Sequence, residues 1–140
     1  MPAQQITLLR PDDWHLHVRD GEVLDDIVPE TSKVFHRAII MPNLVPPVTT
    51  VEAAASYRER ILQAVPAGHV FQPKMALYLT QTTTAEHIRE AASTPYVIGF
   101  KLYPAGATTN SAAGVTDVAS MADVFNTMAG LGVPSLVHGE

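Results

Sequence analysis

Five short apolar runs recur along the chain, and polar segments separate them. The runs cover residues 14–18, 38–41, 75–79, 97–102 and 135–138. Continuous apolar runs of this length are typical of strands that are buried on both faces, as in a parallel sheet. Each run therefore predicts a strand of such a sheet.

The segments between the runs carry apolar residues at three- and four-residue steps, which is the period of an amphipathic helix. This spacing predicts helices over residues 23–31, 51–65, 83–92 and 121–131. Thr49 with Glu52, and Thr83 with Glu86, have the spacing of a capping box at a helix start. The strand–helix alternation predicts a parallel α/β sheet with right-handed crossovers, in one domain over residues 1–140.

Composition narrows the class of protein. Hydrophobic residues make up 46% of the 140, which is enough to build a substantial core. The 14 acidic residues outnumber the 9 basic ones and give a net charge of −5, which argues against a nucleic-acid partner. No apolar run approaches the roughly 20 residues that span a bilayer, and no secretory leader begins the chain, so we expect the cytoplasm and no membrane partner. Because cysteine is absent, a metal would need nitrogen and oxygen ligands.

The densest group of chemically active residues lies in the first run. On a strand, residues two apart point to the same face, so His15, His17 and Arg19 are expected to project together. Two imidazoles about 7 Å apart along a strand can converge on one Zn²⁺ ion. The alternative is that two histidines happen to lie near each other on a surface strand.

A lysine interrupts the fourth apolar run. A buried Lys101 would need a partner or a lowered pKa, and a neutral amine is a nucleophile that can capture carbon dioxide. The alternative is a lysine whose head group reaches water. His138, Lys101 and His17 all lie near the ends of predicted strands, where parallel α/β folds gather reactive residues. We interpret the remaining histidines as solvated and structural: His36, His69 and His87.

These residues occur within longer motifs that resemble a known enzyme family. The segments His15-Leu16-His17, Lys101-Leu102-Tyr103-Pro104 and His138-Gly139-Glu140 are similar to the metal sites of the amidohydrolase superfamily. Residues 10–21, 41–50 and 107–111 resemble bacterial class II dihydroorotases. The resemblance implies a (β/α)₈ TIM-type barrel, of which this chain covers about the first five strands. It also implies the interconversion of N-carbamoyl-L-aspartate and L-dihydroorotate in pyrimidine synthesis.

The same resemblance implies a site with two Zn²⁺ ions. His15 and His17 would hold the more buried zinc, a carboxylated Lys101 would bridge both, and His138 would ligate the second. Substrate contacts would come from His17, Arg19, Asn43, Thr108, Thr109 and His138. The assignment of Arg19 has a physical basis, since a guanidinium binds a carboxylate with two parallel hydrogen bonds. Taken without the resemblance, Asn43 is a plain residue of a proline-rich turn.

Residues 104–115 are rich in Ala, Gly, Thr, Asn and Ser, which is typical of a mobile loop. The resemblance implies a lid that closes over the substrate and contributes the Thr108 and Thr109 hydroxyls. We expect Asn110 and Ser111 to belong to its mobile part. The alternative is a passive connector.

The chain departs from the family in length. A (β/α)₈ barrel typically needs about 250 residues. The family's sixth-strand histidine and its general acid/base aspartate would lie beyond Glu140, so we assign no catalytic proton-transfer residue within this chain. We expect the N-terminal part of an enzyme that acts on a small molecule, and the resemblance implies a homodimer. The alternative is a non-catalytic dihydroorotase-like fragment or subunit that works only through assembly with another chain. A barrel with a phosphate site is disfavoured, because no Gly-rich loop precedes a helix.

Overall fold

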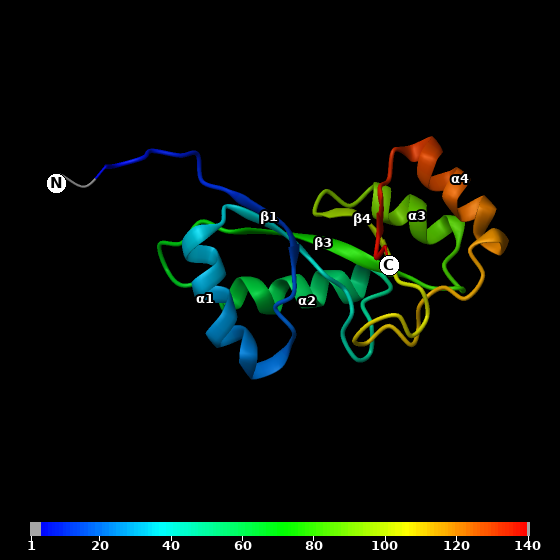
Figure 1. The fold of residues 1–140 in the computed structure, drawn as a ribbon, viewed down its shortest axis with the longest axis horizontal. Coiled ribbons are helices and arrows are strands. Elements are labelled where there is room, and N and C mark those ends of the chain that lie inside the picture. Colours follow the sequence, from blue (N-terminus) through cyan, green and yellow to red (C-terminus); the bar gives the residue numbers. More distant parts are fainter. Residues whose placement is uncertain (1–3, 140) are drawn as a thin grey trace.

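The computed structural model describes residues 4–139, which form five parallel strands and the helices between them (Figure 1). The strands are β1 (Asp12–Leu16), β2 (Arg37–Ile40), β3 (Gln72–Leu79), β4 (Val97–Leu102) and β5 (Ser135–Val137). The helices are α1 (Leu24–Val34), α2 (Val51–Gln63), α3 (Ala85–Ala92) and α4 (Ala122–Leu131), with short 3-10 turns η1 (Gly21–Val23) and η2 (Ala119–Met121). None of the helices within residues 4–139 is long and apolar enough to cross a membrane.

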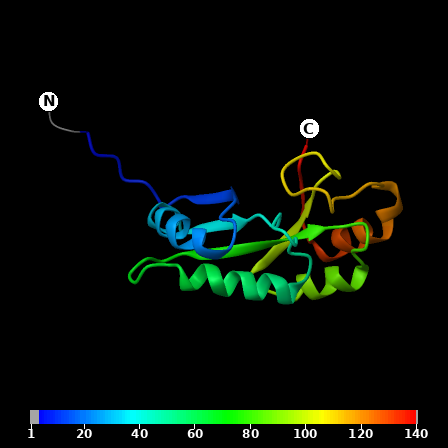
Figure 2. The ribbon, with the colours of Figure 1, turned by 90° about the horizontal axis from the view of Figure 1, so that it is seen from below.

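The sheet confirms the predicted α/β class. Its strands follow one another in chain order, and every neighbouring pair is parallel. The sheet curves, with α2 and α3 along one face, while the loop after β4 rises on the opposite side (Figure 2). Because all strands are parallel, their carboxyl ends share one edge, and this edge carries the candidate site.

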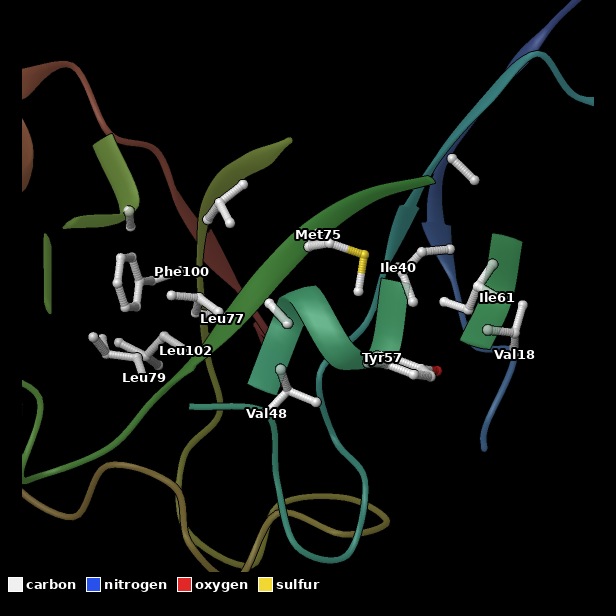
Figure 3. Packing of buried hydrophobic residues seen from close by; sticks show 14 of the residues in the cluster. Val18, Ile40, Val48, Tyr57, Ile61, Met75, Leu77, Leu79, Phe100 and Leu102 are labelled. Atoms are coloured by element: carbon white, nitrogen blue, oxygen red, sulfur yellow. The ribbon is translucent and has the colours of Figure 1, made fainter. Parts of the chain in front are cut away.

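Most of the core lies between the sheet and its helices. Tyr57 and Ile61 of α2 pack near Val18, which follows β1, and near Ile40 of β2 (Figure 3). A smaller apolar cluster forms on the other face of the sheet. It consists of Ile39, Met41 and Ala76, with Ile98 and Leu136 packed against it. The two faces therefore differ: one is covered by helices and the other is the concave face that a closed barrel would enclose.

The helix starts lie one residue later than the capping boxes predict. Thr50, not Thr49, caps α2, because its backbone is extended and its hydroxyl accepts a hydrogen bond from Ala53 N. For α3 the capping pair is Thr84 with His87 rather than Thr83 with Glu86. Adjacent threonines make both registers possible in the sequence, and only the path of the incoming chain selects one.

Candidate active site

Four of the predicted site residues lie near the shared carboxyl edge of the sheet. His17 follows β1, Asn43 follows β2, and His138 follows β5. Lys101 is the penultimate residue of β4. His138 N donates to Leu102 O, which keeps β5 in register with β4 up to this point. The sheet topology thus brings together residues that are far apart in the sequence.

His15 and His17 point to the same side, as the strand period predicts. Their Nε2 atoms are 3.1 Å apart, and their ring centroids are separated by 5.1 Å at an interplanar angle of 44°. Two ring nitrogens that face each other need a proton or a cation between them. Two nitrogens bound tetrahedrally to one zinc at about 2.0–2.1 Å would be roughly 3.3 Å apart, so this pair fits a zinc ion.

Both histidines are held toward the neutral form that binds metals. Burial lowers the pKa of His15, and the positive charge of Lys101 lowers it further. Burial is also the main cause that lowers the pKa of His17, with contributions from the charges of Arg19 and His15. A neutral imidazole keeps a free lone pair, so these shifts favour metal ligation over protonation.

Lys101 is buried on the concave face, with 3% of its surface exposed. Its position does not support the alternative of a head group in water. Burial lowers the pKa of its amine. Its Nζ atom lies 5.4 Å from the centroid of the Tyr103 ring, over the ring face. The amine is therefore positioned as a buried and activated group at the edge of the sheet.

Arg19 reaches the site by a different route from the predicted one. Strand β1 ends at Leu16, and Arg19 has a left-handed backbone with φ of 59°, so strand alternation does not place its side chain. A positive φ is unfavourable for a residue with a Cβ, and such strain clusters at functional sites. Tyr57 holds the turn by donating its hydroxyl to Arg19 O at 2.5 Å. Arg19 also lines a cavity of about 470 Å³ together with the proline-rich turn around Pro46 and with Asn110.

Asn43 links the β2 end to the loop over residues 104–115. Its Nδ2 donates to Thr109 O at 3.0 Å, and Asn110 Nδ2 donates back to Asn43 O at 3.1 Å. Tyr78 OH donates to Asn110 O at 3.3 Å. The two loops accordingly lie side by side in Figure 1. In this arrangement the Asn43 amide binds the loop, and Asn43 is more than a plain turn residue.

Side chains of the loop over residues 104–115 form hydrogen bonds within the loop and to neighbouring segments. Ser111 is 1% exposed, and its Oγ donates to Thr108 O at 2.6 Å and accepts from Thr108 N at 2.9 Å. Asn110 and Ser111 both form hydrogen bonds in this closed arrangement, and their place in the mobile part of the loop stays a prediction. Thr109 remains exposed, and its hydroxyl is available to a ligand. Opening of the loop stays a prediction.

Arg19 Nη1 and Tyr103 OH are buried polar atoms at this edge that have no hydrogen-bond partner among the described residues. The Asn43 side chain interacts with His17 and raises the pKa of that imidazole, against the effect of burial. Buried polar groups are almost always satisfied, so the two exceptions indicate that a bound group completes them. Tyr103 was not a candidate in the sequence analysis. Its position two residues after Lys101 could have identified it, because an extended backbone places side chains two residues apart on the same side.

The donor set seen here is partial. Within residues 4–139, no three histidine or acidic side chains come close enough together to hold a metal ion without the lysine. The other histidines are structural, as expected. His69 Nδ1 is bonded to Ser32 Oγ at 2.8 Å, His36 contacts Gln72, and His87 caps α3.

Comparison with known proteins shows the family to which the chain belongs. The model described as "Amidohydrolase family" matches residues 12–130. The chain belongs to the amidohydrolase family.

Relatives within the amidohydrolase family are named dihydroorotase. The chain is 64% identical to the dihydroorotase of Idiomarina loihiensis over 137 residues. This alignment covers 98% of the chain and 40% of that protein. The crystal structure of dihydroorotase from Campylobacter jejuni superposes with a TM-score of 0.86 at 39% identity, over 94% of this chain and 38% of that one. The Saccharomyces cerevisiae dihydroorotase, solved in complex with 5-fluoroorotic acid, gives 0.84 at 35% identity, over 93% of this chain and 36% of the other. The chain thus spans about 40% of the length of the curated relatives it matches.

Proposed function

We propose that the protein carrying this chain is a zinc-dependent dihydroorotase that interconverts N-carbamoyl-L-aspartate and L-dihydroorotate in pyrimidine biosynthesis. The observation that carries the proposal is the pair of facing His15 and His17 nitrogens beside the buried amine of Lys101 on one sheet edge. The similarity to proteins named dihydroorotase supports the choice of reaction. A cytoplasmic location and a homodimer remain predictions.

In this proposal four residues hold two zinc ions. His15 and His17 would hold the first, His138 would hold the second, and Lys101 as a carbamate would supply oxygen ligands to both. The neutral Lys101 nitrogen attacks the carbon of CO₂, one C–O π pair moves to oxygen, and an N–H proton leaves to solvent. Burial makes the amine easier to deprotonate, which favours this step. The product carries one negative charge and two oxygens, which suits two adjacent cations.

Other residues of the chain bind and orient the substrate. Arg19 and Asn43 bind its carboxylate. The unpartnered Arg19 Nη1 donor supports this subsite, and the Asn43 Nδ2 donor would turn from Thr109 O to the ligand. Thr108 and Thr109 add hydroxyl donors from the loop, which excludes water when it closes. Bound zinc would polarise the ring carbonyl and lower the pKa of a coordinated water. The acid/base aspartate that the resemblance implies is outside this chain, so no residue of residues 1–140 is assigned to proton transfer.

Substitution of Lys101 tests the proposal in the full natural chain. Lys101→Ala should lose the bridge, most of the zinc and most of the turnover of dihydroorotate, and a short carboxylic acid should partly restore both by occupying the gap. Lys101→Arg should not be rescued, because a guanidinium stays charged and cannot form a carbamate. Zinc per chain is measured by atomic spectroscopy, and turnover by loss of dihydroorotate absorbance.

A matched control is Lys74→Ala, which removes a lysine from β3 of the same sheet and should leave zinc and turnover unchanged. Full zinc and full activity in Lys101→Arg would refute the bridge. The same assays on residues 1–140 alone address the alternative function, since a subunit that acts only by assembly would gain activity when the rest of the protein is added in trans.

A further inference from the structure

Tyr103 is a buried tyrosine whose hydroxyl has no hydrogen-bond partner among the described residues. It lies directly after β4, two residues beyond Lys101, and 1% of its surface is exposed. A buried hydroxyl that loses water without gaining a partner costs free energy. An unmatched O–H at the edge where the site residues gather therefore indicates an acceptor that binds there.

The Tyr103 ring is held by its neighbours on both sides. It packs against Tyr78 at a centroid distance of 5.0 Å and an angle of 30°, and against His138 at 5.7 Å and 35°. The Lys101 ammonium position lies over its face. These contacts fix the ring, so the hydroxyl is aimed before any ligand arrives.

The neighbouring tyrosine provides an internal comparison. Tyr78 is also fully buried, but its hydroxyl donates to Asn110 O and serves the loop. The Tyr103 hydroxyl has no such role. The groups around it can donate hydrogen bonds or carry positive charge, namely the Lys101 amine, Arg19 and His138, and together they favour an anionic acceptor with oxygen atoms.

We propose that Tyr103 is a positioning residue whose hydroxyl donates a hydrogen bond to a carboxylate-type oxygen bound beside Lys101. The inference rests on the proposed function, because that oxygen belongs either to the Lys101 carbamate or to the carboxylate of a free ligand. Both sources share one chemistry, a planar CO₂ group with negative charge. The hydroxyl would orient this group, and the stacked ring would keep His138 in line with it.

The test compares Tyr103→Phe with Tyr78→Phe in the full natural chain. Each variant removes one buried hydroxyl and keeps the ring, so a general packing effect would appear in both. Three quantities are measured: zinc retained after dialysis, the ¹³C carbamate signal after exposure to ¹³C-bicarbonate, and the affinity for malonate by calorimetry. Loss of one hydrogen bond to a charged group corresponds to a change of about tenfold or more.

The three measurements distinguish the two possible acceptors, the Lys101 carbamate and a free carboxylate. If the acceptor is the carbamate, Tyr103→Phe loses zinc and carbamate signal before any ligand is added. If the acceptor is a free carboxylate, zinc and carbamate stay intact, malonate binding weakens about tenfold, and KM rises while kcat changes little. Tyr78→Phe should leave zinc and carbamate at the wild-type values in either case. Because the Tyr78 hydroxyl bonds the loop through Asn110 O, an equal weakening of malonate binding in both variants would assign that effect to the loop and not to Tyr103.

Equal behaviour of Tyr103→Phe and the wild type in all three measurements would overturn the role of Tyr103. Absence of zinc and carbamate in the wild type would instead refute the proposed function, while the malonate arm still decides on Tyr103. Should Tyr103→Phe fail to fold, unmodified protein labelled with ¹³Cζ-tyrosine replaces it. A Tyr103 resonance unmoved by bicarbonate and by malonate then rules the hydrogen bond out.

Discussion

Gly114 supports the loop over the site, and alanine at this position should loosen it. A Cβ added to Gly114 would lie 2.3 Å from Tyr103 O, 3.0 Å from Ala105 N and 3.0 Å from Ser111 O. All three are backbone atoms, so no side chain can rotate away. The loop must move by about 1 Å to restore ordinary contact distances.

The cost follows from what this movement breaks. Gly114 N donates to Ser111 O at 2.9 Å, and Val115 N donates to Tyr103 O at 2.8 Å. Losing two such bonds costs about 1–3 kcal/mol in total, and overpacking adds about 1–3 kcal/mol where the backbone cannot yield. We therefore expect the docked loop to lose about 2–6 kcal/mol relative to its open state. That loss corresponds to a rise in the open population of roughly 30-fold to 25,000-fold.

Amide hydrogen exchange measures this population directly. The N–H groups of Ser111, Gly114 and Val115 should exchange faster in Gly114→Ala by roughly the same factor, while amides in β3 stay protected. Gly130→Ala is the matched control, because a Cβ there meets no atom within 4 Å and the residue lies inside α4. That variant should be unchanged or about 1 kcal/mol more stable, since alanine is the better helix former.

The reasoning fails if Gly114→Ala exchanges at wild-type rates in the loop. It also fails if protection is lost throughout the sheet, because the clash would then not be confined to the loop. In either case the close contact with Tyr103 O would not describe the packing that holds the loop over the site.

Two further predictions concern the site residues. Arg19→Lys in the full natural chain should raise KM by about tenfold or more with little change in kcat, because one ammonium cannot reproduce two parallel hydrogen bonds to a carboxylate; an unchanged KM in steady-state assays would rule out substrate contact. In metal-free protein, the pKa values of His15 and His17 are lower in the folded state than the ordinary value of 6.5 that applies to the unfolded chain. Below about pH 6.5 the unfolded chain therefore binds more protons than the folded protein, which favours unfolding. Stability measured by thermal unfolding in EDTA should therefore be full above about pH 6.5 and fall as pH drops below it, and a His15→Gln, His17→Gln double variant should show a flatter profile; an unchanged slope would assign the acid sensitivity elsewhere.

The sequence alone was sufficient for the class of fold and the order of its elements. Apolar runs and helical spacing are local signals, so the five strands and four helices appear close to their predicted places. Strand alternation also predicted that His15 and His17 share a side. The N-caps of α2 and α3 lie one residue later than predicted, because adjacent threonines are equally able to cap and the sequence does not distinguish them.

Only the tertiary structure decided how the site is assembled. Arg19 leaves the strand through a left-handed turn that Tyr57 holds from another helix, and no local period encodes that contact. The loop is bound to Asn43 by a hydrogen bond across 66 residues of sequence, a contact that the loop's composition does not indicate. The unmatched Tyr103 hydroxyl became visible only once its neighbours were in place. Periodicity reports which way a side chain points from its own backbone, whereas burial and missing partners depend on what the rest of the chain brings to that point.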